Sequence, residues 1–236
     1  MDLRRPTLEG ESLIMTFPIV AVLSGDIVKS TKMTAKQLDT VRDVLEVAVK
    51  EARIWSGVTM HGPDFYRGDA WQLVVEDPRW FLRLAVWMKT SLAVSPFKAQ
   101  TRIAIGVGEA EAVDPDVVSR SIGDAFTLSG RALDAMGKRR DMVLALPEEP
   151  VGLSWLAAQV GVCDYIVSRW TRSQAEVALP LLVPNAPSQA EAAEAIGRLP
   201  QAVSRVYRDA GLYVLLEVLE TVEDASFAGL HRKASR

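Results

Sequence analysis

Residues 18–26 read PIVAVLSGD, a short apolar run rich in β-branched side chains that stops at Gly25 and Asp26. Such a run, closed by turn-forming residues, predicts a buried β-strand. Residues 65–75 read FYRGDAWQLVV, in which Gly68 supplies a turn and the following residues are strand-like. A β-hairpin is therefore expected there. The fold follows from how these two stretches are joined to the rest of the chain.

Helical and strand patterns alternate around these stretches. A helix is expected over residues 34–55, where apolar side chains recur at helical spacing and Thr34 forms a capping box with Gln37. The further elements are expected over residues 79–92 (helix), 101–108 (strand), 124–136 (helix) and 142–146 (strand). The order strand, helix, hairpin, helix, strand predicts an α+β fold with a ferredoxin-like or palm-type βαββαβ sheet. Two helices should cover one face and leave the other open to a ligand or partner.

After about residue 153 only helical patterns follow. Capping boxes begin at Thr171 and Ser188, and Pro200 suits the first turn of another helix. The prediction is an all-α, winged or simple, helix-turn-helix domain. The expected division is an α/β domain over 17–150, a helix-turn-helix domain over 151–224, and flexible tails over 1–16 and 225–236.

Composition limits the partners of the chain. Its net charge is −3, and from Tyr165 onward eight basic residues balance eight acidic ones, so DNA binding must depend on a local patch. We see no apolar run of membrane-spanning length and no signal peptide, which predicts a cytoplasmic protein without a membrane partner. The single cysteine, Cys163, is interpreted as a small buried hydrophobe in a reducing compartment.

Two carboxylates are candidate metal ligands. Asp26 follows the first strand and Asp69 lies in the hairpin, and these elements are neighbours in a ferredoxin-like sheet. Mg²⁺, or Mn²⁺ in its place, is often held by one or two carboxylates together with phosphate oxygens. The alternative is ordinary turn chemistry, in which Asp and Gly-Asp are common. The backbone N–H groups expected to face a triphosphate are those of Ile27, Val28, Lys29, Ser30 and Thr31.

Four segments carry a resemblance to a known family. Residues 25–31 (GDIVKST) and 67–69 (RGD) resemble the two metal-binding segments of class III adenylyl and guanylyl cyclases. Residues 102–109 (RIAIGVGE) resemble their following strand, and 122–131 (IGDAFTLSGR) their catalytic helix. With the C-terminal helices included, residues 18–222 are similar to the SatD family, bacterial proteins with a cyclase-like domain and a helix-turn-helix. The resemblance implies a homodimer, a nucleoside triphosphate and a bound metal.

The departures from the cyclase pattern concern the nucleoside. Phe65 stands where cyclases have a base-reading lysine, Arg120 where they have its acidic partner, and Thr127 where an asparagine orients the ribose. Arg131 matches the transition-state arginine, so Arg131 and Thr127 are the catalytic candidates if the domain is active. Phe65 can still stack on a base. These differences favour nucleotide or phosphate binding over cyclisation.

The segment 188–211 has the proportions of a helix-turn-helix. Its second helix should bury an apolar stripe that includes Val203 and Ala210. DNA contacts are predicted for the polar side chains left outside, Gln201, Ser204, Arg205 and Arg208, and for Arg198 in the turn. The alternative is an ordinary helical bundle with a solvated face.

Three hypotheses follow from the sequence. The first is a nucleotide- or metal-binding transcriptional regulator with a degenerate, non-catalytic cyclase-like domain. The second is an active metal-dependent nucleotidyl cyclase, a phosphorus–oxygen lyase, or a related phosphoryl-transfer enzyme. The third is a dimeric scaffold that binds protein partners.

Overall fold

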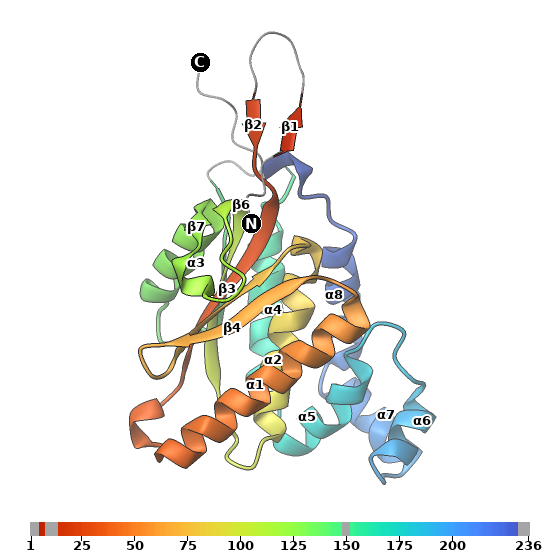
Figure 1. Ribbon diagram of the computed structural model, residues 1–236. Helices are drawn as coiled ribbons and strands as arrows, with labels where there is room; N and C mark the ends of the chain where they lie inside the picture. Colours follow the sequence, from red (N-terminus) through yellow and green to blue (C-terminus); the bar gives the residue numbers. More distant parts are fainter. Residues whose placement is uncertain (1–4, 8–13, 148–151, 231–236) are drawn as a thin grey trace.

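The computed structural model describes residues 5–7, 14–147 and 152–230. Its main sheet has the strand order β4–β5–β3–β6, and both β7 and β8 pair with β6 (Figure 1). The strands are β3 (Ile19–Ile27), β4 (Met60–Tyr66), β5 (Ala70–Val75), β6 (Thr101–Ala112), β7 (Ile122–Gly123) and β8 (Met142–Ala145). Neighbouring strands are antiparallel except β6 and β8, which are parallel. This is the predicted mixed α/β fold. A separate ribbon pairs β1 (Arg5–Thr7) with β2 (Ile14–Thr16), both inside the N-terminal segment for which a flexible tail was expected.

The turn of the β4–β5 hairpin lies where the sequence places it. Arg67 and Gly68 both have left-handed backbone angles, with φ of 52° and 86°. Residues 67–69 join Tyr66 to its register partner Ala70, and glycine adopts the left-handed conformation at position 68 without steric cost. The turn carries Asp69 to the end of the sheet where β3 finishes.

Two helices cover one face of the sheet. They are α1 (Ala35–Ser56) and α2 (Phe81–Val94), which follows a short 3₁₀ turn, η2 (Pro78–Trp80). The predicted capping box of Thr34 and Gln37 is present, and Gly57 ends α1 with a left-handed φ of 67°. Side chains at alternate positions of β3, such as Ala21 and Leu23, are fully buried beneath these helices.

The second face of the sheet is not open, contrary to the sequence-based expectation. Helix α3 (Asp124–Asp134) packs across β3, β6 and β8. The hydroxyl of Ser129 on α3 lies 2.9 Å from that of Ser24 on β3. Gly106 permits this approach, since a Cβ there would lie 2.2 Å from a carbonyl oxygen of α3. Helical periodicity located α3 but carried no information about the face that it covers.

The C-terminal helices pack on the same core. They are α4 (Leu156–Val167), α5 (Arg172–Ala178), α6 (Gln189–Ala195), α7 (Pro200–Asp209) and α8 (Leu212–Glu223). The capping boxes at Thr171 and Ser188 are present as predicted. Because α4, α5 and α8 contact α2, residues 81–92 of α2 are buried on every side.

Two contacts tie the C-terminal part to α2. Arg83 forms an ion pair with Glu223 at the end of α8, and the ring of Phe81 meets that of Phe227 edge-on at 6.3 Å. Residues 225–230 therefore pack against the core, although a flexible tail was expected from 225 onward. The expected boundary at 150/151 lies outside the described residues, and the division into two domains stays a prediction.

Candidate functional site at the Asp26 end of the sheet

The register of the hairpin brings Asp26 and Asp69 to the same end of the sheet. Asp26 on β3 pairs with Ala70 on β5, so Asp69 lies beside Ile27. The backbone N–H of Ile27 donates to the carbonyl oxygen of Asp69 at 3.1 Å. Three of the described strand residues, Ser24, Asp26 and Gln72, share the face that α3 partly covers, since Gln72 donates to the Ser24 hydroxyl at 2.9 Å.

Both carboxylates already have partners in the protein. Arg102, the partner of Asp26 in the β3–β6 register, donates from Nε to Asp26 Oδ1 at 2.9 Å and from Nη2 to Oδ2. This hydrogen bond raises the pKa of Arg102 above its ordinary value. The Ser30 hydroxyl donates to Asp69 Oδ2. Arg102 and Ser30 are thus part of the site. No role was predicted for Arg102, and for Ser30 only a contact between its backbone N–H and a triphosphate was predicted.

The loop after β3 supplies fewer free N–H groups than expected. Those of Ile27 and Val28 donate to the carbonyls of Asp69 and Gln100. Lys29 has a left-handed φ of 59° and precedes a single 3₁₀ turn, η1 (Ser30–Lys32). In the described chain, the backbone N–H groups of Lys29, Ser30 and Thr31 donate to no protein carbonyl. Of the five N–H groups predicted to face a triphosphate, these three remain available.

Phe65, predicted to stack on a base, lies on the face of the sheet opposite to that of Asp26. It pairs with Trp71, which is buried under α1 and α2, and its ring lies 5.8 Å from the guanidinium carbon of Arg42 on α1. Successive side chains of a strand point to opposite faces. The next residue, Tyr66, pairs with Ala70 and therefore shares the face of Asp26.

Tyr66 is an aromatic residue on the face of Asp26 that was not predicted from the sequence. Burial raises the pKa of its hydroxyl, and the carboxylates of Asp64, Asp134 and Asp26 raise it further against the opposing effect of Arg67. Asp134 belongs to the last turn of α3, so α3 runs toward the Asp26 end of the sheet. The alternation of the hairpin, read from the buried Trp71, was the signal that could have identified Tyr66.

The other cyclase-matched residues lie around this face. Thr127 and Arg131 are exposed one turn apart on α3, and the Thr127 hydroxyl bonds back to the carbonyl of Gly123. Arg120 is exposed in the short 3₁₀ turn η3 (Val118–Arg120), which lies against β4 and β5. The structure shows that these side chains are accessible but does not bring them into contact with Asp26 or Asp69.

The residues present suit a partly hydrated divalent cation. Among the described residues no group of three or more His, Cys, Asp or Glu side chains is arranged to hold a metal ion. Two carboxylates and a hydroxyl remain, which is the kind of incomplete set that Mg²⁺ uses when phosphate oxygens complete its coordination. The Asp26–Arg102 pair is 21% and 36% exposed, and exposed pairs contribute only about 0–1 kcal/mol. Breaking this ion pair to admit a divalent cation would therefore cost little.

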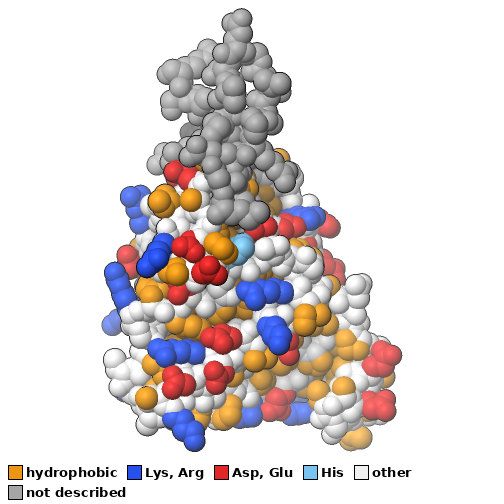
Figure 2. Space-filling model, viewed as in Figure 1, with side chains coloured by type: hydrophobic (Ala, Val, Ile, Leu, Met, Phe, Trp, Pro, Cys, Tyr) orange, Lys and Arg blue, Asp and Glu red, His pale blue; other side chains and the backbone are white. Residues whose placement is uncertain are grey.

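The C-terminal helix pair gives no support to a DNA-reading surface. Gln201, Ser204, Arg205 and Arg208 are exposed as predicted, but Arg205 and Arg208 both lie 3.3 Å from a carboxylate oxygen of Asp209. Arg198 turns back onto α5, where it pairs with Glu176 at 2.6 Å. Figure 2 shows acidic side chains, not a basic cluster, at the α6 corner of the face that it draws.

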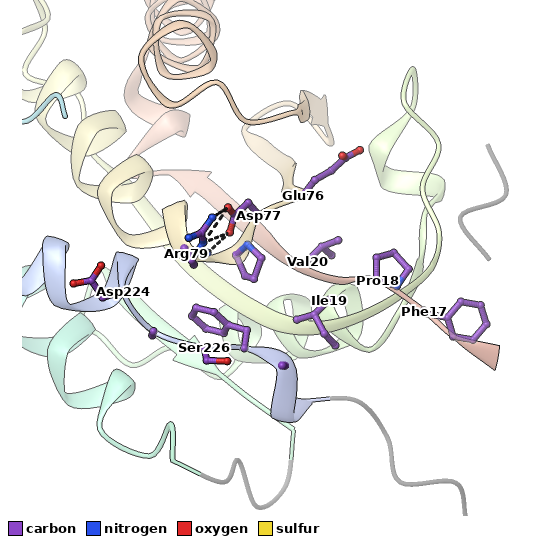
Figure 3. A pocket seen from close by; sticks show the side chains of 13 residues that line it. Phe17, Pro18, Ile19, Val20, Glu76, Asp77, Arg79, Asp224 and Ser226 are labelled. Carbon is purple, nitrogen blue, oxygen red and sulfur yellow. Dashed lines mark hydrogen bonds and ion pairs between the residues drawn. The ribbon is translucent and has the colours of Figure 1, made fainter. Parts of the chain in front are cut away.

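A large cavity lined by described residues is remote from the carboxylates. It has a volume of about 800 Å³ and lies between the start of β3, the 76–79 turn and residues 224–228 (Figure 3). In its lining, Arg79 pairs with Asp77. Ile19 lies in it and Asp26 is seven residues farther along β3, so the two places are roughly 20 Å apart at strand spacing.

Comparisons with known proteins give distant structural similarities. No protein-family model and no curated protein matches the chain. Among solved structures it is similar to the guanylyl cyclase Cya2, with 14% identity and a TM-score of 0.39 over 53% of this chain and 74% of that one. It is also similar to the dimeric guanylyl cyclase domain of the RhoGC fusion protein from the aquatic fungus Blastocladiella emersonii, with 18% identity and a TM-score of 0.41 over 55% and 79%.

Similarity at this level establishes no shared activity, so the functional argument rests on the residues of this chain. The SatD resemblance stays a prediction. No helix in the described parts of the chain has the length and apolar character to cross a membrane.

Proposed function

We propose that the sheet end carrying Asp26 and Asp69 binds Mg²⁺ or Mn²⁺ together with the phosphate groups of a nucleoside triphosphate, as a site of the phosphoryl-transfer class. The observation that carries the proposal is the register that sets Asp26 opposite Ala70 and so beside Asp69. Two adjacent carboxylates at an exposed sheet end, completed by phosphate oxygens, suit Mg²⁺ better than a dedicated protein cage does.

The residues of the chain have distinct parts in this proposal. Asp26 and Asp69 hold the cation, which neutralises phosphate charge when it is bound. Arg102 balances the charge of Asp26 in the absence of the cation. Tyr66 borders the same face, and Arg131, exposed on α3 without a hydrogen-bond or ion-pair partner among the described residues, is available to a phosphate oxygen.

We favour this proposal over a DNA-binding regulator because of the charges at the Asp26 end of the sheet and on α7. Asp26 and Asp69 lie on neighbouring strand ends, whereas the exposed arginines of α7 share the single carboxylate of Asp209. Nucleotidyl cyclisation is the specific reaction that the sequence resemblance suggests. By that resemblance, Phe65, Arg120 and Thr127 replace the residues that read the base and orient the ribose, which argues against rapid turnover of ATP or GTP.

The homodimer remains part of the proposal. Its argument from an uncovered sheet face is weakened, because α3 packs on that face. The argument from the cyclase-like segments remains, since such domains pair about a two-fold axis. Light scattering at tens of micromolar protein, repeated across salt concentrations, measures the oligomeric state directly, and a stable monomer would count against this part.

A thermal-shift screen of nucleoside triphosphates with and without Mg²⁺ or Mn²⁺ tests the proposed function. The expected result is stabilisation that needs both nucleotide and metal and is lost in Asp26→Asn and in Asp69→Asn. The matched control is Asp43→Asn, which removes the charge of an exposed carboxylate on α1. An unchanged shift in the Asp26 and Asp69 variants, or no shift in the unmodified chain, contradicts the proposal.

A further inference from the structure

Three consecutive cations occupy the loop that joins α3 to β8. Lys138, Arg139 and Arg140 are all exposed. No hydrogen bond or ion pair of their side chains is found within the described chain, in contrast to Arg83, Arg102 and Arg198, which are all paired. Adjacent like charges repel one another, and the chain as a whole carries a net charge of −3. This run of unpaired cations is therefore a candidate binding site for an anionic ligand.

The three side chains border a hollow of about 620 Å³. The remaining lining is apolar and comes from the end of α3, the residues after it and β8: Ala132, Ala135, Met136 and Val143. Low-polarity walls reduce the screening by water of the charges above them. The hollow thus combines a cationic rim with an apolar floor, an arrangement that suits an anionic ligand.

The hollow lies at the same end of the sheet as the two carboxylates. Asp141 follows Arg140, and Met142 then pairs with Ile103 on β6, next to Arg102. The backbone N–H of Ile103, the residue after Arg102, donates to the carbonyl of Asp141, which places this loop close to the candidate metal site. Asp26 is two strands from β8, a separation of about 10 Å at ordinary strand spacing.

A buried network holds the loop in place. The N–H of Ile103 donates to the carbonyl of Asp141 at 2.8 Å, and the N–H of Asp141 donates to Asp164 Oδ2 on α4 at 3.0 Å. The buried ammonium of Lys89 lies 3.6 Å from Asp141 and 3.9 Å from Asp164. A loop that is already ordered loses little conformational entropy when it binds a ligand.

The position of the three cations just after the end of α3 explains only part of their clustering. The last turn of a helix favours a nearby cation, because its free carbonyl groups carry partial negative charge. One such cation is enough to balance this partial charge. Arg140 also lies against α4, since a Cβ added to Gly161 would be 3.2 Å from Nη1 of Arg140. The exposed, unpaired side chains of Lys138 and Arg139 remain without a structural role.

We propose that Lys138 and Arg139, supported by Arg140, bind phosphate groups of the nucleotide that the proposed function assigns to this end of the sheet. The proposal rests on that function for the identity of the ligand. It adds a second set of phosphate contacts that does not depend on the metal. Each charge-assisted hydrogen bond contributes about 1.5–3 kcal/mol, which corresponds to roughly tenfold or more in affinity.

The test is a titration of the full chain with ATP, GTP and inorganic triphosphate, each in Mg²⁺ and in EDTA. We expect Lys138→Ala/Arg139→Ala to lose about tenfold or more in affinity in both conditions, with a smaller loss at high salt. The single variant Lys138→Ala is matched by Lys50→Ala, which removes an exposed lysine of α1. The Lys50 variant should bind as the unmodified chain does.

The result separates this inference from the proposed function. If Asp26→Asn leaves the metal dependence unchanged while the loop variant still loses affinity in EDTA, the metal proposal fails and the phosphate contacts stand. If the loop variant binds all three ligands as tightly as the unmodified chain, the inference is overturned. Tighter binding of inorganic triphosphate than of either nucleotide overturns the assignment to a nucleotide and identifies free polyphosphate as the occupant.

Discussion

Arg102 occupies both carboxylate oxygens of Asp26 across the β3–β6 register, although the two residues are 76 positions apart in the chain. The pair lies at the sheet end that also carries Asp69. It keeps the charge of the proposed metal ligand balanced while leaving both side chains partly exposed. A cation bound to Asp26, as proposed, would have to compete with this guanidinium.

Replacing Arg102 by glutamine should strengthen metal binding. The substitution removes the competing charge from Asp26, so we expect an increase of a few-fold or more in Mn²⁺ affinity. The cost in stability should stay near 0–1 kcal/mol, the usual value for a partly exposed pair. Mn²⁺ titration followed by calorimetry measures the first effect and urea denaturation the second. Weaker metal binding in a folded variant would show that Arg102 supports the site instead of competing for it.

Tyr66 and Phe65 should have separable effects although they are neighbours. Tyr66→Ala should weaken nucleotide binding by about 1–3 kcal/mol if a base stacks on its ring. Phe65→Ala should instead lower the free energy of unfolding, because Phe65 packs on the α1 side of the sheet. Nucleotide titration and denaturant unfolding of both variants provide the comparison. Weaker nucleotide binding in the Phe65 variant, with loss of stability in the Tyr66 variant, would contradict the register of the β4–β5 hairpin.

Ending the chain at residue 147 should abolish independent folding of the sheet. Helix α2 is buried on all sides, and the side facing α4, α5 and α8 would be exposed to water. Loss of the Phe81–Phe227 contact and of the Arg83–Glu223 pair adds to that cost. We expect a fragment without a cooperative thermal transition by circular dichroism. A fragment that melts cooperatively would instead support the two independent domains expected from sequence.

Cys163 should be unreactive in the folded protein. Burial, together with the nearby Asp164, raises the pKa of its thiol to about 12 from an ordinary value of 9.0. The folded state thus keeps a proton that the unfolded state loses above pH 9, so this contribution to stability is complete below pH 9 and declines as the pH rises toward 12. Labelling with a thiol reagent at pH 8 should be slow in buffer and complete in urea. Rapid labelling of the native chain would show that the thiol is accessible.

Arg205→Ala/Arg208→Ala should change stability by less than about 0.5 kcal/mol, because both side chains are exposed and pair only with Asp209. The double variant should also bind metal and nucleotide as the unmodified chain does. Gel-shift titrations with a selected DNA library measure the remaining hypothesis. Specific DNA binding that is lost in the variant would restore the regulator interpretation.

Local signals in the sequence were sufficient for most of the elements. The capping boxes at Thr34, Thr171 and Ser188 and the glycine turn at Gly68 are satisfied by residues within a few positions of one another, and the structure contains all of them. The adjacency of Asp26 and Asp69 also followed from the sequence, because the strand order of a βαββαβ sheet makes the first strand and the hairpin neighbours.

Relations between distant residues were decided only by the tertiary structure. The pairing of Arg102 with Asp26 and the position of Phe65 opposite Tyr66 depend on strand register, and a shift of one residue would exchange the faces. The packing of α3 on the second face depends on close contact at Gly106, and the pairing of Arg198 with Glu176 on the arrangement of short helices. Sequence periodicity indicates which side chains of an element are buried, but the element that buries them is determined by contacts between segments far apart in the chain.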